Sequence, residues 1–342
     1  MSLEVYRAGI RKQAVALGLC PGLLLLLFLA SLSVGSARVS VMSLLDGGGI
    51  SEVIVLRIRL PRALTAVVAG AALAVSGSAM QILLRNPLGS PFTLGISHAA
   101  AFGAAFAIVV LGVGSASAGY AGAAAYYMMT LSAFAFSLVS TAVVVGISKK
   151  RGATPETMIL TGVALGSLFT AGVAAVEYFA DDVELSSIIF WTFGDVGRTS
   201  FSDLAVMTAA AVFSVLYFLF NRWRMSALEC GEDSARSLGV NVERVRLRGM
   251  FVASLATATV VSFIGIIGFI GLIVPHMVRK IMGPDPRWQA PASAVLGAVI
   301  LLASDTLART VISPLVLPVG IVTSFMGAPL FIYLILRGRE YW

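Results

Sequence analysis

The chain has 342 residues, of which 58% are hydrophobic and 12% are charged, and its mean hydropathy is +0.94. Soluble domains are about half apolar and about a quarter charged. This composition therefore excludes a disordered chain, a nucleic-acid-binding arm and almost any soluble enzyme. The 24 Lys and Arg residues against 17 Asp and Glu residues leave a net charge of +7. In a membrane protein, the placement of these charges along the chain reports orientation.

Ten segments are apolar over roughly the length that a membrane helix needs, which is about 20 residues. We therefore expect an all-α polytopic membrane protein in which residues 1–342 form a single transmembrane domain. In chain order, the predicted spans are Ala14–Val34, Ala63–Leu84, Phe92–Val113, Ala121–Ile147, Thr157–Ala180, Asp203–Phe220, Met250–Ile264, Ile266–Ile281, Gln289–Thr310 and Val319–Leu336. The 34 glycines are typical of helices that pack closely within a bilayer.

The stretch Met250–Val278 is long enough for one extended helix or for two short ones. Gly265, Gly268 and Gly271 recur at every third residue, and Pro275 follows them. Glycine and proline interrupt regular helices. We therefore predict a break at these glycines, which makes ten spans rather than nine.

The basic residues are distributed unevenly about these spans. With the N-terminus in the cytoplasm, eighteen of the 24 Lys and Arg residues fall on the cytoplasmic side. The exceptions are Arg38, Arg57, Arg59, Arg62, Arg198 and Arg309. Because cytoplasmic loops of membrane proteins are enriched in basic residues, the bias predicts an N-in, C-in topology. It also favours ten spans, since nine would place the basic C-terminal segment outside.

The sequence carries no recognisable catalytic, nucleotide or metal motif. No glycine is followed directly by lysine, so a Walker A loop is absent. Two cysteines and two histidines are too few for a disulfide framework or a zinc site. We therefore expect no catalytic residue, no metal and no cofactor. Glu177 and Asp305, the deepest carboxylates, lie near outer helix ends. An ion-coupled carrier would be expected to hold one near mid-membrane, so that alternative is disfavoured but open.

The cytoplasmic segment 226–242 has the features of two short helices. Ser226 and Glu229 have the spacing of a capping box, which would start the first helix. The second, Glu232–Leu238, would present Ala235 and Leu238 on one side and end at a glycine. Two interpretations stay open: a solvated connector between spans, or a compact knob offered to a cytoplasmic partner.

Three arginines at outer helix ends are exceptions to the cytoplasmic enrichment of basic residues. Arg59 and Arg62 flank the start of the second span, and Arg309 ends the ninth. They could contact lipid headgroups, or they could receive carboxylates of an external protein. Their departure from the bias favours the second role. A fourth candidate, His98, lies at the start of the third span, where a lone histidine more often bonds locally than binds a ligand.

Several segments, in order, resemble one known family. They are Arg59-Leu-Pro-Arg62, Gly70-Ala-Ala-Leu-Ala-Val-Ser-Gly77 with Gln81, Arg85-Asn-Pro-Leu88, Gly162-Val-Ala-Leu-Gly166, Gly231-Glu-Asp-Ser-Ala-Arg-Ser-Leu-Gly239, Gly268-Phe-Ile-Gly-Leu-Ile-Val-Pro-His276, Pro318-Val-Gly-Ile-Val-Thr323 and Gly327-Ala-Pro329. The chain resembles the FecCD family, the membrane permeases of type II ABC importers for iron-siderophores, haem and vitamin B12. The resemblance runs from about Arg57 to Arg337, and its specificity comes from the shared order.

The resemblance implies a type II ABC importer permease fold with ten helices in the inner or cytoplasmic cell membrane. It implies a homodimer with the pathway between the copies, two separate ATP-binding-cassette ATPase subunits and an external substrate-binding protein. The cargo would be a metal chelate: a ferric siderophore, haem or a corrinoid. Family members that move molybdate or tungstate leave an oxyanion as an alternative. The lipid bilayer surrounds the protein, and no nucleic acid partner is expected.

The resemblance also assigns roles to individual residues. Arg59, Arg62 and Arg309 match positions that receive glutamates of the binding protein in the family's vitamin B12 member. The residues matching the coupling helices in the ATPase cleft are Glu232, Asp233, Ser234, Ala235, Arg236, Ser237, Leu238 and Gly239.

A cytoplasmic gate is implied at the turn Ala153–Glu156, with Thr154, Pro155 and Glu156 as its residues. The vitamin B12 member carries small hydroxyl residues there, so Pro155-Glu156 is a departure and the closing chemistry would differ. His98 is a second departure, because it replaces a glycine that usual members have. If His98 faces the pathway, it would bear on substrate choice.

Overall fold

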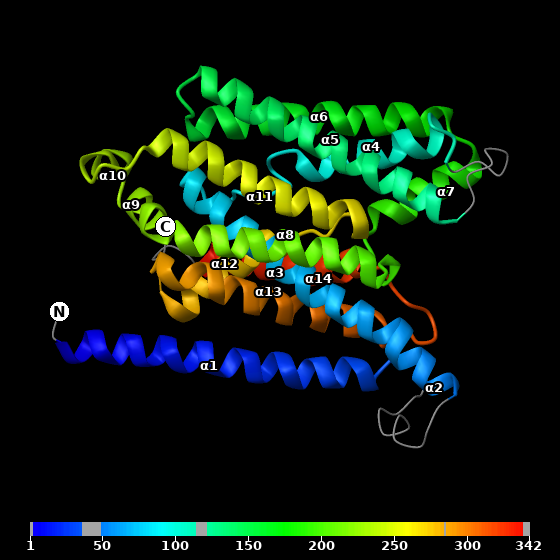
Figure 1. The fold of residues 1–342 in the computed structure, drawn as a ribbon, viewed down its shortest axis with the longest axis horizontal. Helices are drawn as coiled ribbons and strands as arrows, with labels where there is room; N and C mark the ends of the chain where they lie inside the picture. The colour runs from blue at the N-terminus through cyan, green and yellow to red at the C-terminus, as the bar shows by residue number, and fades with distance from the viewer. Residues whose placement is uncertain (1–2, 36–48, 114–121, 284, 338–342) are drawn as a thin grey trace.

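The computed structural model describes residues 3–35, 49–113, 122–283 and 285–337, and it is helical throughout, with no strand in these ranges. The helices run roughly side by side in a bundle (Figure 1). One end of the bundle carries α9 (Arg222–Glu229) and α10 (Glu232–Ser237), and the opposite end carries α2 (Ile50–Val53) and α7 (Asp182–Thr192). We call these the α10 end and the α7 end. The predicted outer residue Arg38 lies outside the described ranges.

Each predicted span coincides with a helix. These helices are α1 Leu3–Ser33, α3 Leu60–Leu84, α4 Ile96–Val109, α5 Ala123–Lys150, α6 Pro155–Phe179, α8 Phe201–Phe220, α11 Val242–Ile264, α12 Ile270–Met282, α13 Pro286–Ala308 and α14 Val319–Arg337. Within the described residues, six helical stretches are long and apolar enough to cross a membrane: those of α3, α5, α6, α8, α11 and α13.

Helix α3 forms the centre of the bundle, with 83% of its most apolar window buried, and α13 packs along it. Glycines bring the two backbones together: a Cβ atom added to Gly70 would lie 2.3 Å from the carbonyl oxygen of Gly297. Helices in a bilayer associate by van der Waals packing, which small residues strengthen by close approach. The glycines are therefore a condition for the α3–α13 contact.

The predicted break between α11 and α12 is confirmed. Gly265 ends α11 in a left-handed conformation (φ +78°), and Phe269 precedes α12 with φ +66°. The carbonyl of Ile264 at the end of α11 accepts a hydrogen bond from the amide of Asp195 at 2.7 Å. The freed helix end thus finds a donor from another segment, as a backbone inside a membrane protein must.

The region between the predicted spans Thr157–Ala180 and Asp203–Phe220 contains the short helix α7. Asp181 and Glu184 form a reciprocal capping box at its start, and Ile188 and Trp191 are buried. With 11 residues, α7 is shorter than a membrane-spanning helix, so the length of apolar segments does not predict it.

The start of α3 was also predicted too late. The six residues Ile54–Arg59 form a π-helix that continues α2 into α3, so the chain between the first two predicted spans is helical from Ile50 onward. Arg59 is thereby fixed on a helix and buried.

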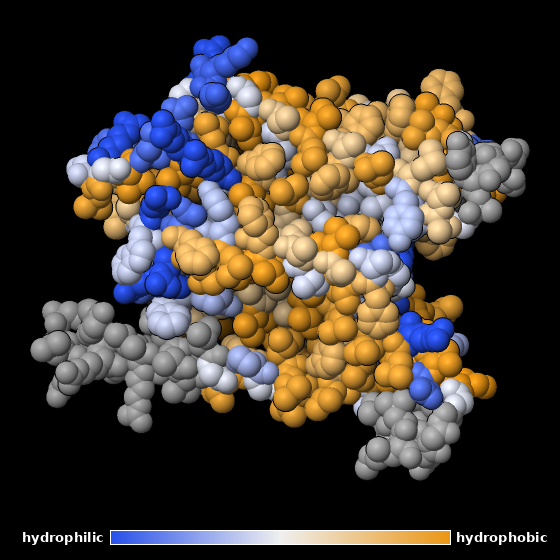
Figure 2. Space-filling model, in the orientation of Figure 1, coloured by the Kyte–Doolittle hydropathy of each residue, from blue (hydrophilic) through white to orange (hydrophobic). Residues whose placement is uncertain are grey.

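Apolar side chains cover most of the visible surface between the two ends, and hydrophilic residues gather at the α10 end (Figure 2). Large exposed hydrophobic side chains on α5, α6 and α8 include Leu131, Val139, Leu160, Leu168, Val206 and Phe213. An apolar surface of this extent on a folded protein indicates contact with lipid or with another chain.

We expect Gly70→Ala to destabilise the protein, because the new methyl group would meet the Gly297 carbonyl. Overpacking of this kind costs about 1–3 kcal/mol. Thermal unfolding in detergent should show a lower midpoint than for the parent. Gly146→Ala is the control, since a Cβ atom there meets nothing within 4 Å. Equal midpoints for Gly70→Ala and Gly146→Ala would contradict the packing argument.

Candidate functional site

The three arginines predicted to dock a binding protein lie together at the α7 end. Asp305 of α13 is fully buried and links two of them: its two carboxylate oxygens accept from Arg62 Nε at 2.8 Å and from Arg309 Nε at 3.0 Å. Arg62 also lies 3.1 Å from the carboxylate of Asp195. We call Arg59, Arg62, Arg309 and Asp305 the arginine cluster.

The arginine cluster also binds the last turn of α1. Arg59 Nη1 donates to the carbonyls of Leu32 at 2.7 Å and Ser33 at 2.9 Å, and Arg309 Nη2 donates to Ser31 Oγ at 2.7 Å. The last four carbonyls of a helix have no partner within it, and the helix dipole favours cations at this end. The cluster thus ties α1 to α3 and α13.

This geometry limits what the arginines offer to an external protein. Arg59 is 4% exposed and Arg309 is 5% exposed, and both use their donors within the chain. A carboxylate from a partner would therefore compete with these internal bonds. The docking role stays a prediction. The four-residue spacing of Asp305 and Arg309 was a signal in the sequence that this cluster is internally paired.

The segment predicted to contact an ATPase lies at the α10 end (Figure 1). Helix α10 has nearly the predicted bounds and is followed by Gly239 with φ +78°. The predicted capping box at Ser226 is wrong: Ser226 lies inside α9, which follows α8 after the single residue Asn221. The expected shared face is also wrong, because Ala235 is buried whereas Leu238, beyond the helix end, is 71% exposed.

The predicted gate turn joins α5 to α6 at the same end of the bundle. Thr154 caps α6, because its hydroxyl oxygen accepts a hydrogen bond from the amide of Thr157 at 3.3 Å. Pro155 occupies the first helical position, where its missing N–H costs nothing. Glu156 is exposed in the first turn. The turn is thus a rigid helix start with one free carboxylate, and its gating role stays a prediction.

His98 lies in the first turn of α4, and its side chain faces α6. Its ring packs against Phe92, with centroids 4.3 Å apart, and Nδ1 lies 3.4 Å from the position a Cβ atom would take at Gly166. Nδ1 is buried and has no hydrogen-bond partner among the described residues. His98 is not among the residues that line the main cavity. A role in a substrate pathway stays a prediction.

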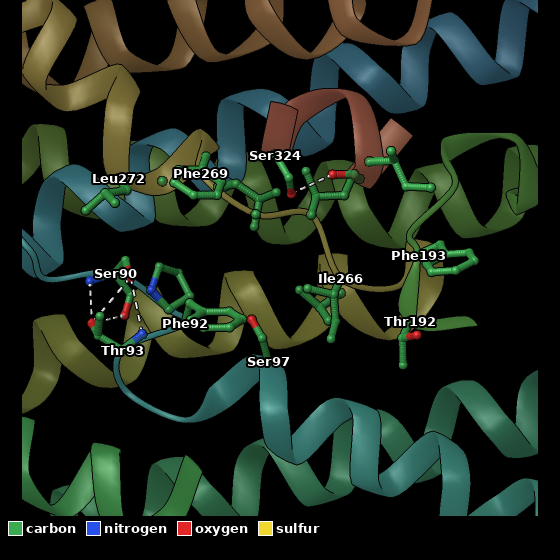
Figure 3. A pocket seen from close by; sticks show the side chains of 18 of the residues that line it. Ser90, Phe92, Thr93, Ser97, Thr192, Phe193, Ile266, Phe269, Leu272 and Ser324 are labelled. Carbon is green, nitrogen blue, oxygen red and sulfur yellow. Dashed lines mark hydrogen bonds between the residues drawn. The ribbon is translucent and has the colours of Figure 1, made fainter. Parts of the chain in front are cut away.

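The main cavity has a volume of about 460 Å³ and lies where the segment before α4, the α11–α12 break and α14 meet (Figure 3). Its walls are mostly apolar, with the hydroxyl groups of Ser90, Thr93, Ser97 and Ser324 among them. None of its lining residues is charged. In the described part of the chain, no three His, Cys, Asp or Glu residues gather as metal ligands. The cavity can accommodate an apolar group but offers no ionic or metal-binding chemistry.

We expect Asp305→Asn to destabilise the protein strongly, because it removes the charge that two buried arginines share. Breaking a buried ion pair on one side costs about 3–5 kcal/mol. Thermal unfolding in detergent measures the loss, and protease sensitivity of α1 reports its release. Asp182→Asn, at an exposed position of α7, is the control. An Asp305→Asn protein as stable as this control would refute the shared-carboxylate role.

Burial raises the pKa of Glu229, at the end of α9, to about 7; Arg279 opposes the rise and Asp285 adds to it. A raised carboxyl pKa means that the folded protein binds the proton more tightly, so stability falls as pH rises from about 4.5 to about 7. We expect the isolated protein to unfold at the same temperature as its Glu229→Gln variant near pH 5, and at a lower temperature at pH 8. The exposed Glu156→Gln should show no such difference. A gap between Glu229→Gln and the parent that does not change with pH would contradict this.

Comparison with known proteins identifies the chain. The sequence pattern of the FecCD transport family matches residues 23–337. An ABC transporter permease protein of Methanocaldococcus jannaschii is 50% identical over 335 residues, covering 95% of each chain. The hemin transport system permease of Yersinia pestis is 38% identical over 323 residues, covering 92% of this chain and 95% of that one.

A solved structure of a metal-chelate type ABC transporter in an inward-facing conformation has a TM-score of 0.82 and 30% identity, covering 95% of this chain and 99% of its own. The helical bundle therefore has the fold of an ABC importer permease. The chain belongs to the FecCD transport family, the multi-pass membrane permease subunits of ABC importers, which work with a separate ATPase and a substrate-binding protein.

Proposed function

We propose that this permease imports a metal chelate, such as a ferric siderophore, haem or a corrinoid, as a homodimer with two ATPase subunits. The observation that carries the proposal is the match to chains named for hemin and metal-chelate transport over nearly the whole length. The main cavity within one copy has apolar walls with scattered hydroxyl groups, which is compatible with contact to the apolar part of such a cargo. Molybdate or tungstate would call for cationic donors, which its lining lacks.

The proposed topology has ten spans with both termini in the cytoplasm, within one permease domain covering 1–342. The α10 end is then cytoplasmic and the α7 end is external. This agrees with the hydrophilic residues gathered at the α10 end (Figure 2). The coupling segment 226–242 would enter the ATPase cleft, and the arginine cluster would face the binding protein.

The proposed dimer interface involves α6. Only 17% of its most apolar window is buried within the chain, the smallest share among the six long helical stretches. A second copy packed here would line a pathway between the copies and place the two gate turns near each other. Lipid is the alternative neighbour of this surface.

In the proposed mechanism, ATP binding displaces α10 and shifts the permease between outward-open and inward-open states. A ligand shifts such an equilibrium only through contacts that differ between the states. An ion-coupled mechanism is disfavoured further because Asp305, one of the two deepest carboxylates, is already bonded to Arg62 and Arg309 within the chain.

We expect ATP-dependent uptake of hemin into proteoliposomes that contain the permease, its ATPase and its binding protein. Vesicles with an ATPase variant that binds but does not hydrolyse ATP are the matched control, and they should accumulate none. Radiolabelled cargo gives the measurement. Uptake driven by a proton gradient without ATP would establish the carrier mechanism instead. Uptake of molybdate, with none of hemin, cobalamin or ferric siderophores, would establish the oxyanion alternative.

A further inference from the structure

One buried arginine at the α10 end contacts three separate elements. Arg246 lies in the second turn of α11 and is 1% exposed. Its Nε donates to the carbonyl of Leu83 at 2.8 Å, its Nη1 donates to the carbonyl of Ala153 at 2.7 Å, and its Nη2 donates to Glu232 Oε1 at 2.5 Å. A single guanidinium thus joins the end of α3, the gate turn and the coupling helix.

The contact with α3 has a reason in the sequence. A helical carbonyl normally accepts from the amide four residues later. Four residues after Leu83 is Pro87, which has no N–H to donate. The Leu83 carbonyl would be unsatisfied in the protein interior without Arg246, so the end of α3 holds the guanidinium in place.

The second contact reaches the gate turn directly. Ala153 immediately precedes Thr154, the cap of α6, and has φ +54°, which is unusual for a residue with a side chain. Its carbonyl points to Arg246, and its amide donates to the carbonyl of Ser148 at 2.7 Å. Both backbone groups of Ala153 are therefore hydrogen-bonded, and displacement of Arg246 would shift the start of α6.

The third contact reaches the helix that we propose enters the ATPase cleft. Glu232 is the first residue of α10, and its other oxygen lies 3.6 Å from the largely exposed Arg236. Apolar packing follows the same route, because Ala153, Met158 and Ala235 belong to one buried cluster. Neutral donors would suffice to satisfy the two carbonyls, so the ion pair to α10 is the part that a purely structural cap does not need.

We propose that Arg246 is the positioning residue through which displacement of α10 is transmitted to the α5–α6 turn. This inference rests on the proposed function, in which α10 receives the ATPase. It requires the contacts to form a two-state element that ATPase binding biases, and that requirement can be measured.

The test follows the exposure of the turn in the complex of permease and ATPase. A parent carrying Glu156→Cys, with Cys20→Ser and Cys230→Ser, is labelled with a maleimide with and without ATP. In Glu232→Gln and Arg246→Met, labelled as complexes that contain the ATPase, we expect the nucleotide-dependent difference in labelling rate to fall by about fivefold or more. Arg246→Met, which lies outside the coupling segment, should still copurify an ATPase that hydrolyses ATP. The matched control is Arg244→Met, which replaces an exposed arginine two residues before Arg246 on α11. This variant should behave as the parent.

Glu232→Gln covers the case in which Arg246→Met does not fold, since it leaves the arginine and both carbonyl bonds in place. Hydrogen exchange over residues 151–157 in the permease alone gives a second measurement, and it should be faster in Arg246→Met than in Arg244→Met.

The results separate the two proposals. Nucleotide-dependent labelling retained in Glu232→Gln complexes that contain the ATPase would overturn the role of Arg246 and leave the importer assignment standing. A parent that copurifies no ATPase would overturn the proposed function, and the inference with it.

Discussion

The need to satisfy helix-end carbonyls without water governs this fold. Inside a bilayer, a backbone group without a partner is costly, and a helix always leaves four carbonyls at its end. Here buried arginines supply the donors at two distant places: Arg59 and Arg309 for α1, and Arg246 for α3. Each guanidinium carries several donors in a rigid plane. Each therefore joins neighbouring helices while it satisfies one of them.

Both arginine sites depend on a central helix that is held by close backbone contact. The glycine pair between α3 and α13 sets the distance at which Arg62 of α3 can reach Asp305 of α13, the carboxylate that also pairs with Arg309. The small residues at the centre of the bundle and the arginines at its ends thus act together to hold the helices in place. The first provides the close packing that replaces hydrophobic driving force in lipid, and the second fixes the ends of the packed helices.

Hydropathy located the ten helices that overlap the predicted spans, and the glycines at 265–271 predicted the break, because both signals are local in the sequence. The direction of a side chain is not local. Charge placement assigned Arg59 and Arg309 to one end of the bundle, but their burial depends on the end of α1, more than 25 residues from one and about 280 from the other. The capping box at Ser226 was wrong for a related reason: two residues at the right spacing do not reveal that a helix has already begun.

The span of chain between Ser31 and Arg309, 278 positions, has a consequence for biogenesis. Helix α1 is made well before α13. Arg59 can therefore bond the last turn of α1 early, whereas Arg309 becomes available only 278 residues after Ser31. Until then α1 lies in the membrane without its contact to α13, which Arg309 completes. Assembly of this permease therefore joins an early helix to a late one, and a ribosome that stops before residue 309 releases a bundle in which the last turn of α1 has its bonds to Arg59 without those to Arg309.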